Sequence, residues 1–453
     1  MKRGRGIVVS AIASLGLAAA VAGAADSGEQ AASERGREAL TRGSYLPPAW
    51  GLDAYAKARR FLGPDAPDPE SEPEGYAKAF NAYFGLHPAP YPNDGLPMGL
   101  RRARRRDGSD VGLQLDCLIC HGGSIGGQSY VGLGNTQLDL DAVLKQFTVA
   151  DGQVPPPILY TLNTARGTNN AGQIAVVLLS LRNADLSFRK FPLLTGASLP
   201  ELDTPPWWIL KKKRTKYYDG RTPARATRSN MQFYLGSLSA QEFKELEPTF
   251  QDIDAYLMSL EPPKYPFAVD AAKAGRGRDV FEANCVRCHG TYGEGWTYPN
   301  KIVPLDIVGT DPARAKGISD RFIDHYNSSW FGEVDKADEM MTGYQAPPLD
   351  GLWATAPYLH NGSVPTLYHL LKSSARPSRF LRPPSTDFAH YDAERVGWKF
   401  EEVSGARPTG LSRPEAMSLY NTSRWGLGNG GHTFGDKLSE EERMDLIEYL
   451  KTL

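Results

Sequence analysis

The stretch CLICH at residues 117–121, with its counterpart CVRCH at residues 285–289, decides how this chain is organised. The two stretches contain all four cysteines of the 453 residues, and a histidine directly follows each pair. In a C-x-x-C-H motif, two thiols one turn of chain apart can form thioethers along one edge of a haem, and the adjacent imidazole can bind its iron. The spacing therefore predicts two covalently bound c-type haems. The residues assigned are Cys117, Cys120 and the axial ligand His121 for haem 1, and Cys285, Cys288 and the axial ligand His289 for haem 2.

Two other uses of paired cysteines fit the sequence less well. A structural zinc site usually separates its two halves by about 15 to 20 residues, whereas these pairs lie much further apart. A pair of disulfides is conceivable in an oxidising compartment. Neither alternative explains why a histidine follows both pairs in a chain that has only 8 histidines. The motifs therefore favour haem attachment.

The composition favours long loops around a sizeable core. The chain has 46 glycines and 34 prolines, which is rich in turn-forming residues for a globular protein. Its length and its 41% hydrophobic content predict two or three domains. The charges are nearly balanced, with 51 basic and 52 acidic residues. The chain therefore has no overall electrostatic field that would attract nucleic acid, and we do not expect nucleic acid as a partner.

The first 24 residues are typical of a secretory signal peptide. Three cations within the first five residues precede an Ala-rich apolar run, and small residues end the run at positions 22–24. An uncleaved membrane anchor is the alternative. We expect cleavage after Ala24 or Ala25 and an exported protein, periplasmic or secreted. No later segment has the roughly 20 apolar residues of a membrane helix, so we expect no membrane span after cleavage.

Two amphipathic helices are predicted at corresponding places. Apolar residues recur at helical spacing from Leu246 to Leu260, with Pro248 in the first turn. At the C-terminus, Ser439 and Glu442 form a capping-box pattern before a second apolar face. The proline-rich segment 261–267 between them is predicted to be a linker.

The sequence thus predicts a mainly α fold with extensive loops, made of two cytochrome c-like haem domains plus an N-terminal extension. The expected boundaries are residues 1–24 for the signal peptide, 25–110 for an extension that wraps haem 1, 111–262 for the first haem domain and 263–453 for the second. The stretch AAKAGRGRDVFEANCVRCHG, a short predicted helix running into the second motif, resembles the small class I cytochrome c domain.

Arginines in the extension could pair with haem propionates or an acidic partner, or could lie in a solvated loop; they are Arg101, Arg102, Arg104, Arg105 and Arg106.

The sixth ligand of each haem iron, on the face opposite the motif histidine, decides whether the protein can be an enzyme or only an electron carrier. A haem face without such a ligand can bind dioxygen or peroxide. No histidine lies between His121 and His289. The remaining candidates for the distal face of haem 1 are His87, Met98, Met231 and Met258. Methionines are more often core residues than ligands, so we expect haem 1 to be open or weakly closed.

Two further stretches carry a family resemblance. YQAPPLDGLWATAPYLHNGSVPTL, from Tyr344 to Leu367, resembles a motif of the bacterial di-haem cytochrome c peroxidase superfamily, and GNGGHTFGDKLSEEERMDLIEYLKTL resembles the ending of its rubber oxygenase members, which cleave polyisoprene with dioxygen. The resemblance implies His432 as the second axial ligand of haem 2, and His360 as a conformational or supporting residue. The peroxidases instead use a methionine some 14 residues beyond the motif histidine, a position held here by Ser374. The chain is also shorter than the rubber oxygenases, so the resemblance implies di-haem redox chemistry more firmly than any substrate.

The expected function is a di-haem oxygenase or peroxidase-like oxidoreductase. Haem 2, with two histidine ligands, would relay electrons, and haem 1 would activate dioxygen or peroxide; an electron donor or organic substrate, unidentified, would be the other partner. Trp207 and Trp208 could form an electron relay between the haems or simply pack in the core. The basic cluster from Lys211 to Arg214 could dock an acidic redox partner or be a solvated loop. The main alternative is a non-catalytic periplasmic di-haem electron carrier, and a third is a redox module serving a dehydrogenase.

Overall fold

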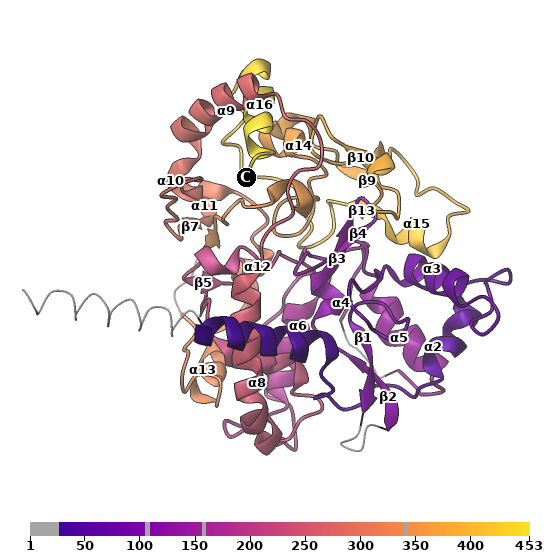
Figure 1. The fold of residues 1–453 in the computed structure, drawn as a ribbon. Helices are drawn as coiled ribbons and strands as arrows, with labels where there is room; N and C mark the ends of the chain where they lie inside the picture. Colours follow the sequence, from indigo (N-terminus) through magenta and orange to yellow (C-terminus); the bar gives the residue numbers. More distant parts are fainter. Residues whose placement is uncertain (1–26, 105–108, 156–159, 339–342) are drawn as a thin grey trace, which may run out of the picture.

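The structure, a computed structural model, describes residues 27–104, 109–155, 160–338 and 343–453. The predicted signal peptide lies outside these ranges. Helices and long loops make up most of the described chain, and the strands form small sheets of two or three (Figure 1). The expected mainly α class with extensive loops agrees with this architecture. None of the helices in these ranges is long and apolar enough to cross a membrane.

The N-terminal part contributes helices and one hairpin. Residues 27–42 form a helix that lies against α8, where Arg35 donates two hydrogen bonds to Asp252 and Gly36 packs on the Asp252 carbonyl (Figure 1). Strands β1 (Leu100–Arg104) and β2 (Asp110–Leu115) pair antiparallel just before the first motif. The helices up to the linker are α2 (Ala54–Lys57), α3 (Pro73–Phe84), α4 (Leu118–His121), α5 (Leu140–Ala150), α6 (Ala171–Ser180), α7 (Thr227–Met231) and α8 (Ala240–Ser259).

Helix α8 carries the predicted apolar face, but it begins earlier than expected. Its buried residues include Phe250, Ile253 and Leu257, as the spacing predicts. A capping box between Ser239 and Glu242 starts the helix at Ala240, so Pro248 lies inside the helix rather than in its first turn. The prediction for Pro248 was wrong because this stronger start signal lies further upstream.

The second motif follows a helix that packs across the C-terminal helix of the chain. Helix α9 (Ala271–Asn284) runs into α10 (Val286–His289) and packs against α16 (Glu440–Leu450) at the C-terminus (Figure 1). The crossing is close at Gly277, where an added Cβ would lie 1.9 Å from the Asp445 carbonyl oxygen. The predicted capping box of Ser439 and Glu442 starts α16. Segment 261–267 has no regular secondary structure, as expected of a linker.

Short elements connect these helices. The remaining helices are α11 (Leu305–Val308), α12 (Ala313–Gly317), α13 (Asp320–Ser328), α14 (Leu367–Leu371) and α15 (Arg413–Met417). The remaining strands are β3 (Gly122–Ile125), β4 (Gln128–Val131), β5 (Thr215–Lys216), β6 (Thr222–Pro223), β7 (Ile302–Pro304), β8 (Gly343–Gln345), β9 (Arg379–Leu381), β10 (Tyr391–Asp392), β11 (Gly397–Trp398), β12 (Glu401–Glu402) and β13 (Leu419–Asn421). Single 3-10 turns are η1 (Ala58–Phe61), η2 (Leu210–Lys212), η3 (Gln232–Tyr234), η4 (Leu352–Thr355), η5 (Ser373–Ala375) and η6 (Phe388–His390).

Separate apolar cores surround the two motifs. The first joins α6 and α8 with residues of α13, among them Phe322 and Tyr326, although α13 follows the predicted domain boundary at residue 262. The second gathers α9, α14 and α16 around Trp208 and Trp353. Because Trp207 belongs to the first core and Trp208 to the second, this tryptophan pair lies where the two cores meet.

Two candidate haem sites

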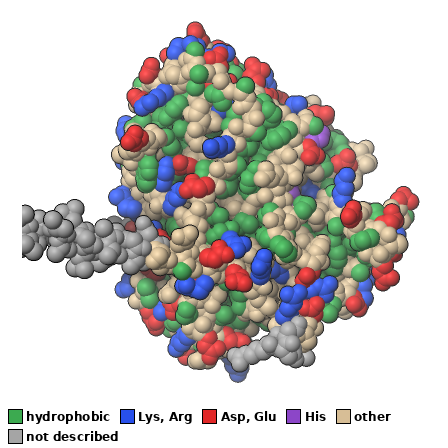
Figure 2. All heavy atoms as spheres, viewed as in Figure 1, with side chains coloured by type: hydrophobic (Ala, Val, Ile, Leu, Met, Phe, Trp, Pro, Cys, Tyr) green, Lys and Arg blue, Asp and Glu red, His purple; other side chains and the backbone are tan. Residues whose placement is uncertain are grey.

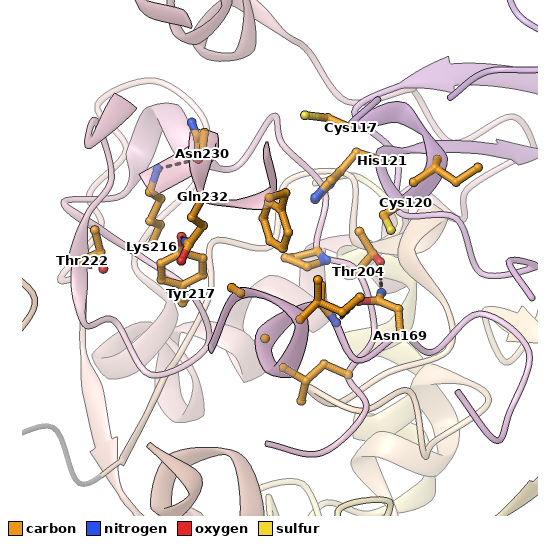
Figure 3. Close-up of a pocket in the computed structure, with 18 of the residues that line it drawn as sticks. Cys117, Cys120, His121, Asn169, Thr204, Lys216, Tyr217, Thr222, Asn230 and Gln232 are labelled. Carbon is orange, nitrogen blue, oxygen red and sulfur yellow. Dashed lines mark hydrogen bonds between the residues drawn. The ribbon is translucent and has the colours of Figure 1, made fainter. Parts of the chain in front are cut away.

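A cavity of about 550 Å³ opens beside the first motif. Cys117, Cys120 and His121 lie together at one side of it (Figure 3). Much of the remaining wall is apolar, with side chains from α5, α6, α8 and α13; among them are Leu140, Val176, Phe250 and Phe322, and Leu199 is added from the loop after α6. The volume is typical of cofactor sites, which span about 300–1,000 Å³. Two thiols and an imidazole against an apolar cavity fit a covalently bound haem.

His121 is held in place by one ring contact and by backbone hydrogen bonds. The Trp207 ring stacks on the His121 ring, with centroids 4.3 Å apart and an angle of 17° between the planes. Gly132 ties the two residues together, because its N–H donates to the His121 carbonyl and its carbonyl accepts from the Trp207 N–H, each at 2.8 Å. Burial lowers the pKa of His121 to about 3, which leaves the ring neutral. A neutral, immobilised imidazole is suited to bind a metal.

None of the four predicted distal candidates lines this cavity. His87 uses both ring nitrogens elsewhere, donating from Nε2 to Asn135 at 3.1 Å and accepting at Nδ1 from Ser124 at 2.9 Å. Met98 packs against Gly122, behind the motif helix. Met231 and Met258 are buried in the protein interior. Among the described lining residues, His121 is the sole histidine and there is no methionine.

The arginines before the first motif pair with carboxylates of the chain instead of facing the cavity. Arg101 is buried and donates to Asp116 at 2.7 Å. Arg102 and Arg104, on the same strand, both pair with Asp110. Arg105 and Arg106 lie outside the described residues. The expected propionate contacts therefore do not come from Arg101, Arg102 or Arg104, because none of the three lines the cavity and each pairs with an acidic neighbour.

The second motif faces another histidine. The rings of His289 and His432 have centroids 6.3 Å apart and are inclined by 63°. One metal held between two imidazoles, with nitrogens about 2 Å from it and ring centres about 1.15 Å further, would separate the centroids by about 6.3 Å. His289 donates from Nδ1 to the Pro347 carbonyl at 2.8 Å, which leaves the Nε2 lone pair free. Burial lowers the pKa of both histidines, to about 4 for His432. The pair fits a haem iron bound on both faces.

The loop that carries His432 is fixed by its backbone. His432 has a positive φ of 45°, and its N–H donates to the Val308 carbonyl at 2.6 Å. At Gly431, an added Cβ would lie 2.1 Å from the carbonyl carbon of Gly309, whereas at Gly430 the nearest atom would be 4.0 Å away. Gly431 is therefore required for a close backbone contact with Gly309.

Arg376 organises the same loop and was not predicted. Its guanidinium donates to the carbonyls of Asn429 at 2.6 Å, of Gly431 at 2.7 Å and of His432 at 3.2 Å. It also donates to two carbonyls of α14, so that all five of its N–H groups are used. Because every acceptor is a backbone oxygen, no pattern of side chains in the sequence could have revealed this contact.

His360 and the tryptophan pair lie between the two sites. His360 is buried, stacks on Tyr344 with centroids 4.3 Å apart, and lies edge-on to Tyr218, which lines the cavity. Trp208 donates from its indole nitrogen to the Asp350 carbonyl at 2.8 Å. Lys212, in the basic run from Lys211 to Arg214, forms an ion pair of 2.6 Å with Asp350. These contacts join the first site to the segment that holds His289.

The cysteines do not have the properties of a zinc site or a redox pair. Within the described ranges no group of three or more His, Cys, Asp or Glu side chains could hold a metal ion by itself. Burial raises the pKa of Cys117 to about 11 and of Cys120 to about 12, and that of Cys285 to about 11. Redox-active dithiols instead have lowered thiol pKa values.

Comparison with known proteins supports a relationship to the cytochrome c family. A family model described as "RoxA-like, cytochrome c-like" matches residues 343–381, a part of the chain that includes His360 and Arg376. The chain is also similar to two proteins of Sinorhizobium fredii (strain NBRC 101917 / NGR234). It is 33% identical to "Uncharacterized protein y4iM" over 239 residues, covering 44% of this chain and 52% of that protein. It is 29% identical to "Uncharacterized protein y4iJ" over 262 residues, covering 43% of this chain and 41% of that protein. The matches thus span about half the length of these relatives.

Proposed function

We propose that this protein is an exported di-haem c-type cytochrome with oxidoreductase activity, in which one haem reacts and the other relays electrons. The observation that carries the proposal is the contrast between the two motifs. His121 faces a cavity of about 550 Å³, whereas His289 faces His432. A haem with one protein ligand is open to a small oxidant, and a haem with two is suited to electron transfer.

The residues around the first motif prepare a site for dioxygen or peroxide. A haem held there would supply the redox chemistry. His121 would hold it from one side, and Trp207 and Gly132 fix the orientation of the His121 ring. The apolar wall excludes water and accepts an uncharged oxidant or an apolar organic substrate. The rubber oxygenase resemblance suggests dioxygen chemistry, but the matched relatives name no substrate.

A continuous path supports a relay role for Trp207 and Trp208. Trp207 stacks on His121, and the adjacent Trp208 donates a hydrogen bond to the Asp350 carbonyl. Three residues earlier, the Pro347 carbonyl accepts from His289. The path therefore runs from one motif histidine to the other through one ring stack, two hydrogen bonds and a short length of chain. His360, between Tyr218 and Tyr344, supports the packing beside this path.

Carbon monoxide binding tests the proposal. After reduction with dithionite, the protein is expected to bind one carbon monoxide for every two haems, because His432 blocks the second iron. Binding is measured by optical titration against the haem content. Absence of binding would contradict an oxidant-activating site and support the electron carrier instead, whereas two bound molecules would contradict the relay haem.

A further inference from the structure

The side of the cavity opposite the cysteines is strongly basic. Lys216, Tyr217 and Thr222 lie across the cavity from Cys117, Cys120 and His121 (Figure 3). They belong to the short β5–β6 hairpin, and α12 adds Arg314 to the same lining. The cationic side chains that line the cavity are Lys213, Lys216, Arg221 and Arg314.

The carboxyl groups that line the cavity itself offer little negative charge to these cations. Asp219 is fully buried and pairs with both Arg221 and Arg314, at 3.2 Å each. Of the two carboxyl groups among the described lining residues, Asp116 is taken by Arg101. The other, Asp203, has its pKa raised well above the usual range by burial, which favours its neutral form.

Two buried nitrogens at this side of the cavity lack a hydrogen-bond partner. Arg314 is only 6% exposed, and its Nη1 is buried with no hydrogen-bond acceptor. His360, whose pKa the Arg314 charge lowers further, has a buried Nε2 that is likewise without a partner. Lys216 donates to the Ala226 carbonyl at 2.9 Å and to Asn230 at 2.7 Å. Burial lowers the pKa of Lys213 to about 7 and of Lys216 to about 8, so a carboxylate in the cavity would favour their charged forms. Buried polar groups are nearly always satisfied, so the free Arg314 donor calls for an acceptor at this side of the cavity, and a carboxylate is the acceptor that a guanidinium pairs with best.

We propose that the basic cluster of Lys213, Lys216, Arg221 and Arg314 binds the propionate carboxylates of haem 1. This rests on the proposed haem at the first motif. In a porphyrin attached through its vinyl groups, the propionates extend from the opposite edge, so thioethers at Cys117 and Cys120 direct them across the cavity. Guanidinium groups bind carboxylates bidentately, and the two propionate carboxylates would neutralise part of the positive charge of these side chains. Arg314 is the strongest candidate because it has an unused, buried donor.

The test compares Arg314→Gln, Arg314→Lys and the wild type in the full di-haem protein. Haem content is measured first, by the pyridine haemochrome assay. The reduction potential of the carbon monoxide-binding haem is then followed by spectroelectrochemistry, and the propionate bands by resonance Raman spectroscopy. We expect Arg314→Gln to keep both haems, to lower the potential of haem 1 alone and to shift its propionate bands. Loss of the nearby positive charge stabilises the ferric state, and Arg314→Lys should restore part of the potential.

Arg228→Gln is the matched control, because Arg228 pairs with Glu247 and Glu333 and does not line the cavity. It should leave the potential and the bands of haem 1 unchanged. Unchanged propionate bands in Arg314→Gln, with both haems present, would overturn the proposal. If added fatty acid perturbed the haem 1 spectrum in the wild type and not in such a variant, the cluster would instead bind a substrate carboxylate. A wild type without two haems would refute the proposed function itself, before any substitution.

Discussion

The two motif regions begin alike and end in different environments. Each motif forms one helical turn, α4 or α10, that presents two cysteines and a histidine. The first continues into the β3–β4 hairpin and faces a large, mainly apolar cavity with a basic far side. The second is approached by α9, and its histidine is faced by His432 from the C-terminal loop. Figure 2 shows charged and hydrophobic side chains interspersed over one face of the molecule. Under the proposed function the same five-residue motif would serve two roles, because its surroundings would determine access to the second face of the metal.

Removing one pair of cysteines should have the largest effect on this comparison. The double substitution Cys117→Ser and Cys120→Ser is expected to reduce the haem content from two to one and to abolish carbon monoxide binding. The reciprocal change at Cys285 and Cys288 should also leave one haem, but with carbon monoxide binding retained. Haem content by pyridine haemochrome and intact mass reports the outcome. If both variants behaved alike towards carbon monoxide, the two sites would be equivalent and the comparison would fail.

His432→Ala should make the second site resemble the first. Removing the ring opposite His289 opens one face of the second iron, so we expect haem 2 to change from low to high spin and a second carbon monoxide to bind. Electron paramagnetic resonance and optical titration measure this change. His390→Ala, which removes a histidine from the short turn η6, is the control and should change neither. An unaltered low-spin signal in His432→Ala would refute the assignment of His432.

Arg376→Lys should produce a weaker form of the same change. A lysine cannot replace the five hydrogen bonds by which Arg376 holds α14 and the His432 loop, and each lost bond costs about 0.5–1.5 kcal/mol. We expect a mixture of low-spin and high-spin haem 2 that moves towards high spin on warming. Arg379→Lys is the control, since Arg379 donates to the exposed Gly405 carbonyl. A fully low-spin haem 2 in Arg376→Lys would show that the loop is held by other contacts.

Gly277→Ala should have the smallest effect on the haems and a measurable effect on stability. Its Cβ would meet the Asp445 carbonyl at the α9–α16 crossing, so we expect a loss of about 1–3 kcal/mol in the free energy of unfolding. Gly275→Ala, on the same helix with nothing within 4 Å, should instead stabilise by up to about 1 kcal/mol. Denaturant titration followed at the haem 2 absorbance compares the two. Equal effects would mean that the helices do not cross as closely as described.

Local signals predicted the local structure well. The capping box at Ser439 and the apolar face of α8 follow from short-range patterns, and both are present. The start of α8 was missed because its capping box, Ser239 and Glu242, lies seven and four positions before Leu246, the first residue of the recognised face. The approach of His432 to His289 followed from a family resemblance and not from periodicity, since the two lie far apart in the chain.

Long-range contacts account for what the sequence could not reveal. The basic side of the cavity combines a hairpin with α12, and Arg376 acts through backbone carbonyls that have no sequence signature. The arginines before the first motif were conspicuous as a run, yet Arg101 pairs with Asp116 and does not itself line the cavity. A cluster of charge in sequence therefore says little about which charges meet in space.

The electron paramagnetic resonance spectrum of the oxidised wild type tests the central claim most directly. The account predicts one high-spin and one low-spin ferric haem in equal amounts, because His121 faces a cavity and His289 faces a second imidazole. Two low-spin signals would contradict it, since both irons would then be bound on both faces.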